Sequence, residues 1–240
     1  MKKKIVIISG VLVFICGVIT IIKFSEEITA SLVNRLLIVT KHTVNFRTTS
    51  PYVSRRTINK VLAPSLGKNI LDVDAQALER ELRKNEWISS VAIEKVFPNE
   101  LSVDVTTHQA LGIVVLDRLY YINENFELFK KVQNADDHNF MYITGLFDNK
   151  DLDNDALKEC LIYIEKNKGL LVSELHVDKN EGITLYMMDS VGKVLLGIDN
   201  FTKKLEHLAL IHDDLQKKNI DFQFINLSSL DQGVVKKMEL

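Results

Sequence analysis

The sequence is poor in cysteine, proline and glycine: its 240 residues include only two cysteines, three prolines and ten glycines. Two cysteines are too few for a disulfide framework, so an exported domain of this sequence must be held together by its hydrophobic core. Hydrophobic residues make up 46% of the chain, which is enough for such a core. Few prolines and glycines also leave no low-complexity linker, so we expect a compact chain from about Thr43 onward.

An excess of charge of one sign is also missing. The 30 Lys and Arg residues are offset by 32 Asp and Glu residues, which gives a formal net charge of −2. Proteins that bind nucleic acid or an anionic membrane surface by electrostatics carry a basic excess instead. We therefore expect no nucleic-acid partner.

Patterns that bind metals, cofactors or phosphate are missing as well. The histidines, at 42, 108, 138, 176, 207 and 212, include no pair at i, i+4 and no H-E-x-x-H motif. G-x-S-x-G, P-loop and dinucleotide-binding glycine patterns are absent too. Cys160 falls in a predicted helix, where a buried inert thiol is expected rather than a nucleophile. The sequence thus predicts no cofactor, no metal and no small-molecule substrate.

Two S-x-x-K strings leave one class of enzyme open. Ser65–Lys68 and Ser190–Lys193 have the spacing that places a hydroxyl beside an amine in serine-lysine enzymes. Both strings lie in predicted turns, and neither is accompanied by the S-D-N or K-T-G strings of those enzymes. A membrane-anchored serine-lysine peptidase is kept as an alternative, and it requires Ser65 or Ser190 to react with a covalent acyl probe.

A long apolar run stands near the start of the chain. Ile5–Ile22 contains no charged residue, and as a helix rising about 1.5 Å per residue it would be roughly 27 Å long, close to the hydrocarbon core of a bilayer. Lys2–Lys4 precede it, and positive charge stays on the cytoplasmic side. We therefore predict a cytoplasmic tail over 1–4, a transmembrane helix over 5–23 and an extracytoplasmic chain from Phe24 onward.

A cleaved signal peptide is the alternative to an anchor. Signal peptides have an apolar region of about 7–15 residues and then a small-x-small cleavage site. The run here is longer, and the residues that follow it, Lys23–Glu27 (KFSEE), contain no such triplet. We favour one uncleaved anchor in the lipid bilayer. Cys16 would then lie in the membrane and Cys160 outside it, so the two thiols would not pair within one chain.

Residues 24–42 continue with a helical stripe of apolar residues. Phe24, Ile28, Leu32, Leu36 and Val39 recur at intervals of three or four residues. The spacing predicts a juxtamembrane helix over 24–42. It either simply continues the anchor or offers a surface to a partner helix lying alongside, and both interpretations remain open.

Residues 43–108 are predicted to form a β-α-α-β-β unit. A short extended run at Val44–Arg47 is followed by a helix at Val53–Ala63 and by a second helix capped by Asp72 or Asp74. A hairpin then turns at Pro98-Asn99-Glu100, and its second strand alternates apolar and polar residues over Leu101–Thr106. Such alternation indicates one buried and one solvated face, hence a hairpin packed on the two helices.

Residues 109–240 are predicted to form a mostly antiparallel β domain with two helices, which gives the chain an α+β fold. The helices are expected at about Asn154–Lys168 and Phe201–Lys218. Strands are expected at Leu111–Leu116, Leu119–Asn123, Glu127–Val132, Phe140–Leu146, Leu171–Val177, Ile183–Met188, Val194–Ile198, Phe222–Leu227 and Val234–Glu239. The final hairpin is expected to leave its last strand at an edge of the sheet, where unpaired N–H and C=O groups accept a partner strand.

Three segments resemble the bacterial FtsQ/DivIB family of cell-division proteins. In Trp87–Leu101 (WISSVAIEKVFPNEL) a Trp starts a strand and a proline turn leads to a Leu-x-Val-x-Val strand, as in that family. Gly67–Asp74 (GKNILDVD) is similar to the family's loop before its second helix, and Tyr120–Phe129 (YYINENFELF) to its next hairpin. The family order of short tail, single membrane helix, POTRA domain and β domain matches nearly the whole chain.

The resemblance implies a non-enzymatic divisome scaffold in the bacterial inner membrane at the division septum, with its C-terminal domains outside the cytoplasm. It would link early septal-ring proteins to FtsB/DivIC-like and FtsL-like partners, and the POTRA-like unit would offer a second interface. For the partner-binding edge we predict Phe222, Phe224, Val234, Val235, Lys236, Lys237, Met238 and Glu239. Besides the peptidase, a POTRA chaperone-like protein of envelope assembly remains an alternative.

Overall fold

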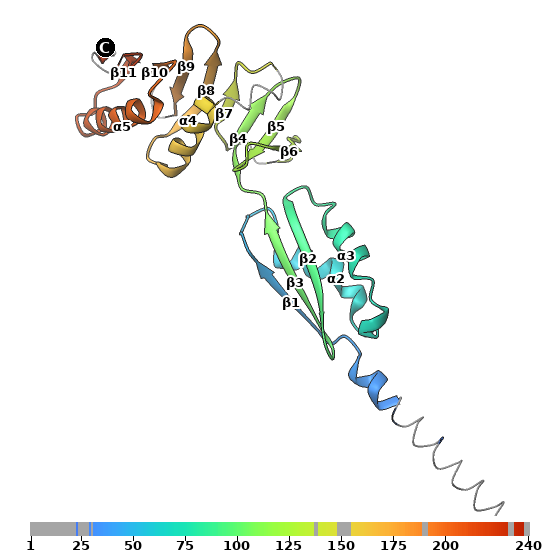
Figure 1. Ribbon diagram of the computed structural model, residues 1–240. Coiled ribbons are helices and arrows are strands. Elements are labelled where there is room, and N and C mark those ends of the chain that lie inside the picture. The colour runs from blue at the N-terminus through green and yellow to red at the C-terminus, as the bar shows by residue number, and fades with distance from the viewer. Residues whose placement is uncertain are drawn as a thin grey trace, which may run out of the picture. The chain divides into compact units, whose positions relative to one another are not determined.

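The computed structural model describes residues 23, 29, 31–136, 139–147, 155–188, 192–229 and 233–237 (Figure 1). These residues fall into two compact units, which divide between Thr107 and His108. The predicted anchor, Ile5–Ile22, lies outside the described residues. Within them, no helix combines the length and the apolarity that crossing a bilayer requires.

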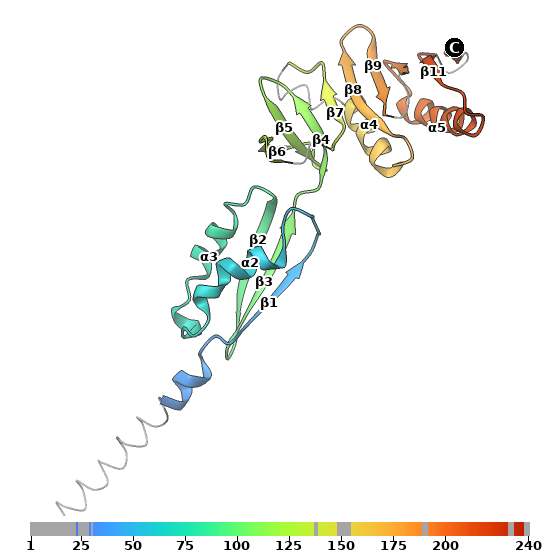
Figure 2. The same cartoon turned by 180° about the vertical axis from the view of Figure 1, so that it is seen from behind.

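The first unit has the predicted β-α-α-β-β order. Its elements are β1 (Lys41–Phe46), α2 (Arg55–Leu62), η1 (Ala63–Ser65), η2 (Ile70–Asp72), α3 (Ala75–Leu82), β2 (Ile88–Val96) and β3 (Glu100–Thr107). β3 is the central strand of the sheet and pairs parallel with β1 and antiparallel with β2. Both α-helices lie on the same face of this sheet, as the two opposite views show (Figures 1 and 2).

Local sequence sets where these helices begin. The side chain of Ser54 caps α2 by accepting from the backbone N–H of Thr57, and Asp74 caps α3 by accepting from that of Ala77. The alternation of apolar and polar residues in β3 predicted one buried face, and the structure confirms it. The apolar positions Leu101, Val103 and Val105 are fully buried under the helices.

The helix predicted over 24–42 was placed wrongly at its C-terminal end. Described residues 31–36 are helical, but β1 already begins at Lys41. In between, the N–H of Val39 donates to the carbonyl of Lys68 at 2.8 Å, and its carbonyl accepts from the N–H of Gly67 at 3.0 Å. These long-range bonds replace helical ones and bury Val39, although its position fits the helical stripe.

In its described residues, the second unit contains a nine-stranded sheet and two helices. Its elements are β4 (Ala110–Val115), β5 (Leu119–Asn123), β6 (Leu128–Lys131), β7 (Tyr142–Thr144), α4 (Asp155–Lys166), β8 (Val172–Asp178), β9 (Gly182–Met187), β10 (Lys193–Gly197), α5 (Phe201–Lys217), β11 (Phe222–Asn226) and β12 (Val234–Lys237). The strand order is β12-β11-β10-β9-β8-β7-β4-β5-β6. Both predicted helices are present, and β12 ends the sheet as an edge strand.

Most neighbouring strands in the described part of this sheet are antiparallel, as predicted, but three of its pairs are parallel: β4 with β7, β7 with β8, and β10 with β11. α4 connects β7 to β8, and α5 connects β10 to β11. Parallel strands need such crossover connections, so the two helices account for two of the parallel pairs.

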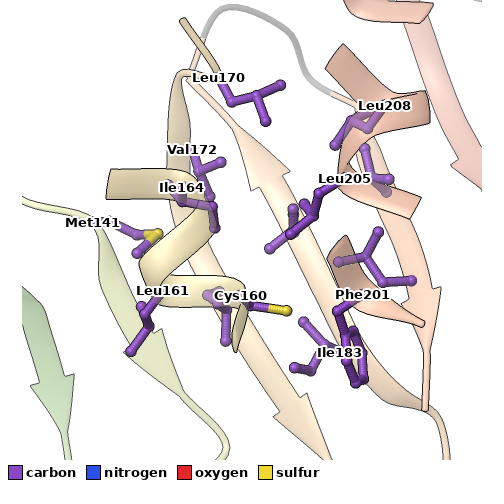
Figure 3. Close-up of a cluster of buried hydrophobic side chains, with 14 of the residues drawn as sticks. Met141, Cys160, Leu161, Ile164, Leu170, Val172, Ile183, Phe201, Leu205 and Leu208 are labelled. Carbon is purple, nitrogen blue, oxygen red and sulfur yellow. The ribbon is translucent and has the colours of Figure 1, made fainter. Parts of the chain in front are cut away.

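The core of the second unit lies between the sheet and its two helices (Figure 3). α4 contributes Leu157, Cys160, Leu161 and Ile164, and α5 contributes Phe201, Leu205, Leu208 and Leu215. Figure 3 shows Cys160 on the side of α4 that faces Phe201. One face of the sheet is thus covered by helices.

Candidate partner-binding edge

The edge strand β12 is bound to the sheet on one side only. It pairs antiparallel with β11, and in the described part of the chain no strand pairs with its other side. All four residues of Val234–Lys237 are exposed. At the opposite edge of the sheet, only Lys131 of β6 is exposed. β12 is therefore the more accessible of the two edges.

The register of the sheet tells which way the side chains of β12 point. Val235 pairs with Ile225, which continues a cross-strand row of fully buried residues: Ile143, Leu175, Leu185, Val194 and Ile225. Val235 thus stands at the end of the core row, yet it is 36% exposed because it lies at the edge. Its neighbours Val234 and Lys236 belong to the opposite, helix-free face.

The two phenylalanines predicted for this edge lie in different environments. Phe222 is 2% exposed and belongs to the core, so its prediction as a partner-binding residue was wrong. Phe224 is half-buried on the open face, beside Lys236 of β12, and the ammonium of Lys193 lies 5.8 Å from its ring centroid. Of the other predicted residues, Met238 and Glu239 lie outside the described residues.

A buried lysine on α5 supports the neighbouring strands. The side chain of Lys204 is only 1% exposed, and its ammonium donates to the carbonyls of Leu196 at 2.8 Å and Ser228 at 3.0 Å. It also donates to Asp199 at 2.7 Å and thereby lowers the pKa of that exposed carboxyl. Lys204 therefore joins α5 to the end of β10 and to the residue that follows β11 by two. Sequence reasoning missed it.

Ser65 does not have the geometry of a nucleophile. It is 3% exposed, and its hydroxyl donates to the carbonyl of Leu62 at 2.7 Å while lying 2.8 Å from Nε2 of His42. A hydroxyl has one hydrogen, so His42 must be the donor in the second contact and is not positioned as a base. Lys68 is exposed. Ser190, of the other S-x-x-K string, lies outside the described residues.

The Cys160 thiol and the possible metal ligands also show no arrangement for catalysis among the described residues. Cys160 is fully buried, and burial raises the pKa of its thiol, so the thiol stays protonated. Among the described residues, no group of three or more His, Cys, Asp or Glu side chains is placed to hold a metal ion.

Two family models match the chain. Residues 42–108 match the POTRA domain of FtsQ type, and residues 112–228 match the C-terminal domain of the cell division protein FtsQ/DivIB. The fold is thus that of a POTRA domain followed by a β-rich C-terminal domain.

Curated relatives agree with these models. A cell division protein FtsQ from a Geobacter species is 32% identical over 198 residues, which cover 78% of this chain and 72% of the relative. Those from Geotalea daltonii and Myxococcus fulvus are 30% and 27% identical, covering 72% and 73% of this chain and 66% and 65% of the relatives. The chain belongs to the FtsQ/DivIB family of cell division proteins, as the resemblance predicted.

Proposed function

We propose that the chain is a non-enzymatic scaffold of the division machinery that holds a partner by strand addition at β12. The observation that carries this proposal is the edge strand itself, whose four residues are exposed and which, among the strands that the structure describes, pairs with β11 alone. A strand added there would gain main-chain hydrogen bonds, and the side chains exposed along the edge would select those of the added strand.

The edge offers two kinds of contact to an added strand. Val235 presents apolar surface at the end of the core row, while Lys236 and Lys237 present positive charge. A partner segment that alternates apolar and acidic residues would fit both. In the absence of a partner, the same lysines would deter pairing between two copies of this edge, because like charges would then meet.

Membership of the family suggests the setting. We infer partners of the FtsB/DivIC and FtsL types, and a site of action at the division septum with the two described units outside the cytoplasm. The apolar run Ile5–Ile22 would anchor the chain in the inner membrane. The POTRA unit would supply a second interface for recruitment.

Two adjacent proline substitutions test strand addition. Backbone N–H groups of neighbouring residues in a strand point to opposite sides, so Val235→Pro and Lys236→Pro each remove a different donor. One donor serves the pairing with β11, and the other serves only an added strand. We expect the variant whose unfolding transition is unchanged to lose capture of an FtsB-type partner from a co-expressing cell.

Lys236→Ala is the matched control, since it removes the charge and keeps the N–H. It should weaken capture only modestly and in a salt-dependent way. Partner capture by both folded proline variants at the parental level would rule out strand addition. In that case photoreactive residues placed along 222–240 would show which surface is used instead.

A further inference from the structure

Three segments that are distant in sequence meet at one end of the first unit. The N–H of Thr40 donates to the carbonyl of Asn99 at 3.0 Å, which places the β2–β3 turn beside the start of β1. The N–H of Ile70 donates to the carbonyl of Leu37 at 2.8 Å, which adds the loop after α2. The ammonium of Lys95 reaches the carbonyl of Leu71 at 3.0 Å and joins that loop to β2.

This end carries large apolar side chains that the unit does not bury. We call them the apolar tip; they are Leu66, Leu71, Val96 and Phe97, with exposed fractions of 47%, 59%, 43% and 58%. Leu32 and Leu36 of the preceding helix are also exposed, at 56% and 63%. Apolar surface gathered in this way marks an interaction site rather than a chance exposure.

We propose that the apolar tip rests in the interfacial layer of the bilayer that Ile5–Ile22 is predicted to cross. The chain that follows Ile22 enters the folded unit at Leu37, whose carbonyl accepts from the N–H of Ile70, the residue next to Leu71 of the apolar tip. A bilayer holding the run would therefore lie on the side of the unit where the exposed apolar residues are. The proposal rests on the anchor and not on any division partner.

Apolar insertion, rather than charge, carries the contact. Lys41, beside the tip, is paired with Glu100 at 3.2 Å, and Glu94 and Asp72 lie next to Lys95 and Leu71 in the sequence. The whole chain also has no basic excess. Side chains at the ends of loops and turns enter a lipid interface without the groove that a partner helix needs, and their affinity grows with buried apolar area.

Site-specific probes on the full-length chain in nanodiscs test the contact. A nitrobenzoxadiazole dye is attached to Phe97→Cys or Leu71→Cys in a Cys16→Ala background, where Cys160 is buried and unreactive. Lipids with a shallow nitroxide serve as quenchers. We expect roughly twofold or greater quenching at both positions, because interfacial apolar groups lie about 5–10 Å into the headgroup boundary.

The control is Ser90→Cys, an exposed position toward the other end of β2 from Phe97, which should not be quenched. Quenching should be equal in phosphatidylcholine and in mixed phosphatidylethanolamine and phosphatidylglycerol discs. Quenching no greater than at Ser90→Cys overturns the proposal, and so does quenching that requires the anionic lipid. Dye emission that is shifted to the blue without quenching overturns the proposal, because the tip is then covered by a second copy of the chain and not by lipid. A chain that is recovered without lipid overturns the predicted anchor, on which the proposal rests. None of these outcomes bears on partner capture by β12.

Discussion

Replacing Lys204 with methionine removes the buried ammonium while keeping the apolar stem. In the parent protein this group donates to the carbonyls of Leu196 and Ser228, and it lies 1% exposed between α5 and the strands. Lys204→Met leaves both carbonyls without that donor. The second unit should therefore be destabilised, and the first should not.

The magnitude follows from how deeply each acceptor lies. Leu196 is fully buried, and a buried acceptor left unpaired costs about 1–3 kcal/mol. Ser228 is exposed, so water replaces part of the hydrogen bond that its carbonyl loses. The substitution also removes the cost of keeping the Lys204 ammonium out of water, which offsets part of the loss. We expect the free energy of unfolding of the second unit to fall by about 2 kcal/mol.

Urea unfolding of the full chain in detergent measures this change. Trp87, the one tryptophan of the sequence, is stacked on Tyr52 at 3.9 Å in the first unit, so its fluorescence follows that unit. Far-UV circular dichroism follows both. The Lys204→Met transition should shift in dichroism alone, whereas Lys203→Met, at the exposed neighbouring position, should shift neither signal. Equal stability of the two variants would refute the role assigned to Lys204.

Two further predictions concern pH and reactivity. Burial lowers the pKa of both His42 and His108, and Glu124 and Glu127 oppose this shift in His108 by a smaller amount. As the pH falls, these histidines are therefore protonated in the unfolded chain before they are protonated in the folded one. The free energy of unfolding should decrease as the pH drops below about 6.5. His42→Gln should flatten this pH dependence in Trp87 fluorescence and His108→Gln in dichroism, and a slope unchanged in either variant would contradict the assignment. Labelling by a fluorophosphonate acyl probe should be the same for the parent and Ser65→Ala, and labelling that disappears with Ser65 would revive the peptidase alternative.

The first unit could be predicted from local patterns because its signals are local. The alternation over Leu101–Thr106 and the turn at Pro98-Asn99-Glu100 are contained in one short segment, and they produced β2 and β3. The prediction that Val39 lies in a helix was wrong because the backbone of Val39 is hydrogen-bonded to Gly67 and Lys68. These residues are distant in sequence, and the spacing of apolar residues in a helix gives no information about such contacts. The three parallel pairings of the second unit are likewise set by which strands meet, and not by any local pattern.

The candidate edge could be predicted only in part. Phe222 and Phe224 are two apart, which in a regular strand places both on one face. A shift of register between them sends Phe222 into the core and leaves Phe224 on the open face. Lys204 did have a signal in the sequence, because it lies three residues after Phe201 and four before Leu208, on the inward side of α5. Lysine is rarely fully buried, so the spacing alone does not predict burial at this position.

If the proposed strand addition at β12 holds, partner binding and the stability of the second unit should depend on each other. β12 has a single described pairing, and its four residues bury little, so its order depends on β11 and on the segment that leads from it. Lys204 fixes that segment at Ser228. An added strand would give β12 a second set of hydrogen bonds, and a ligand that binds only the ordered edge stabilises it by mass action. Such a coupling would be reciprocal. Lys204→Met should then weaken partner capture although the Lys204 side chain is only 1% exposed, and saturating partner should restore part of the lost stability.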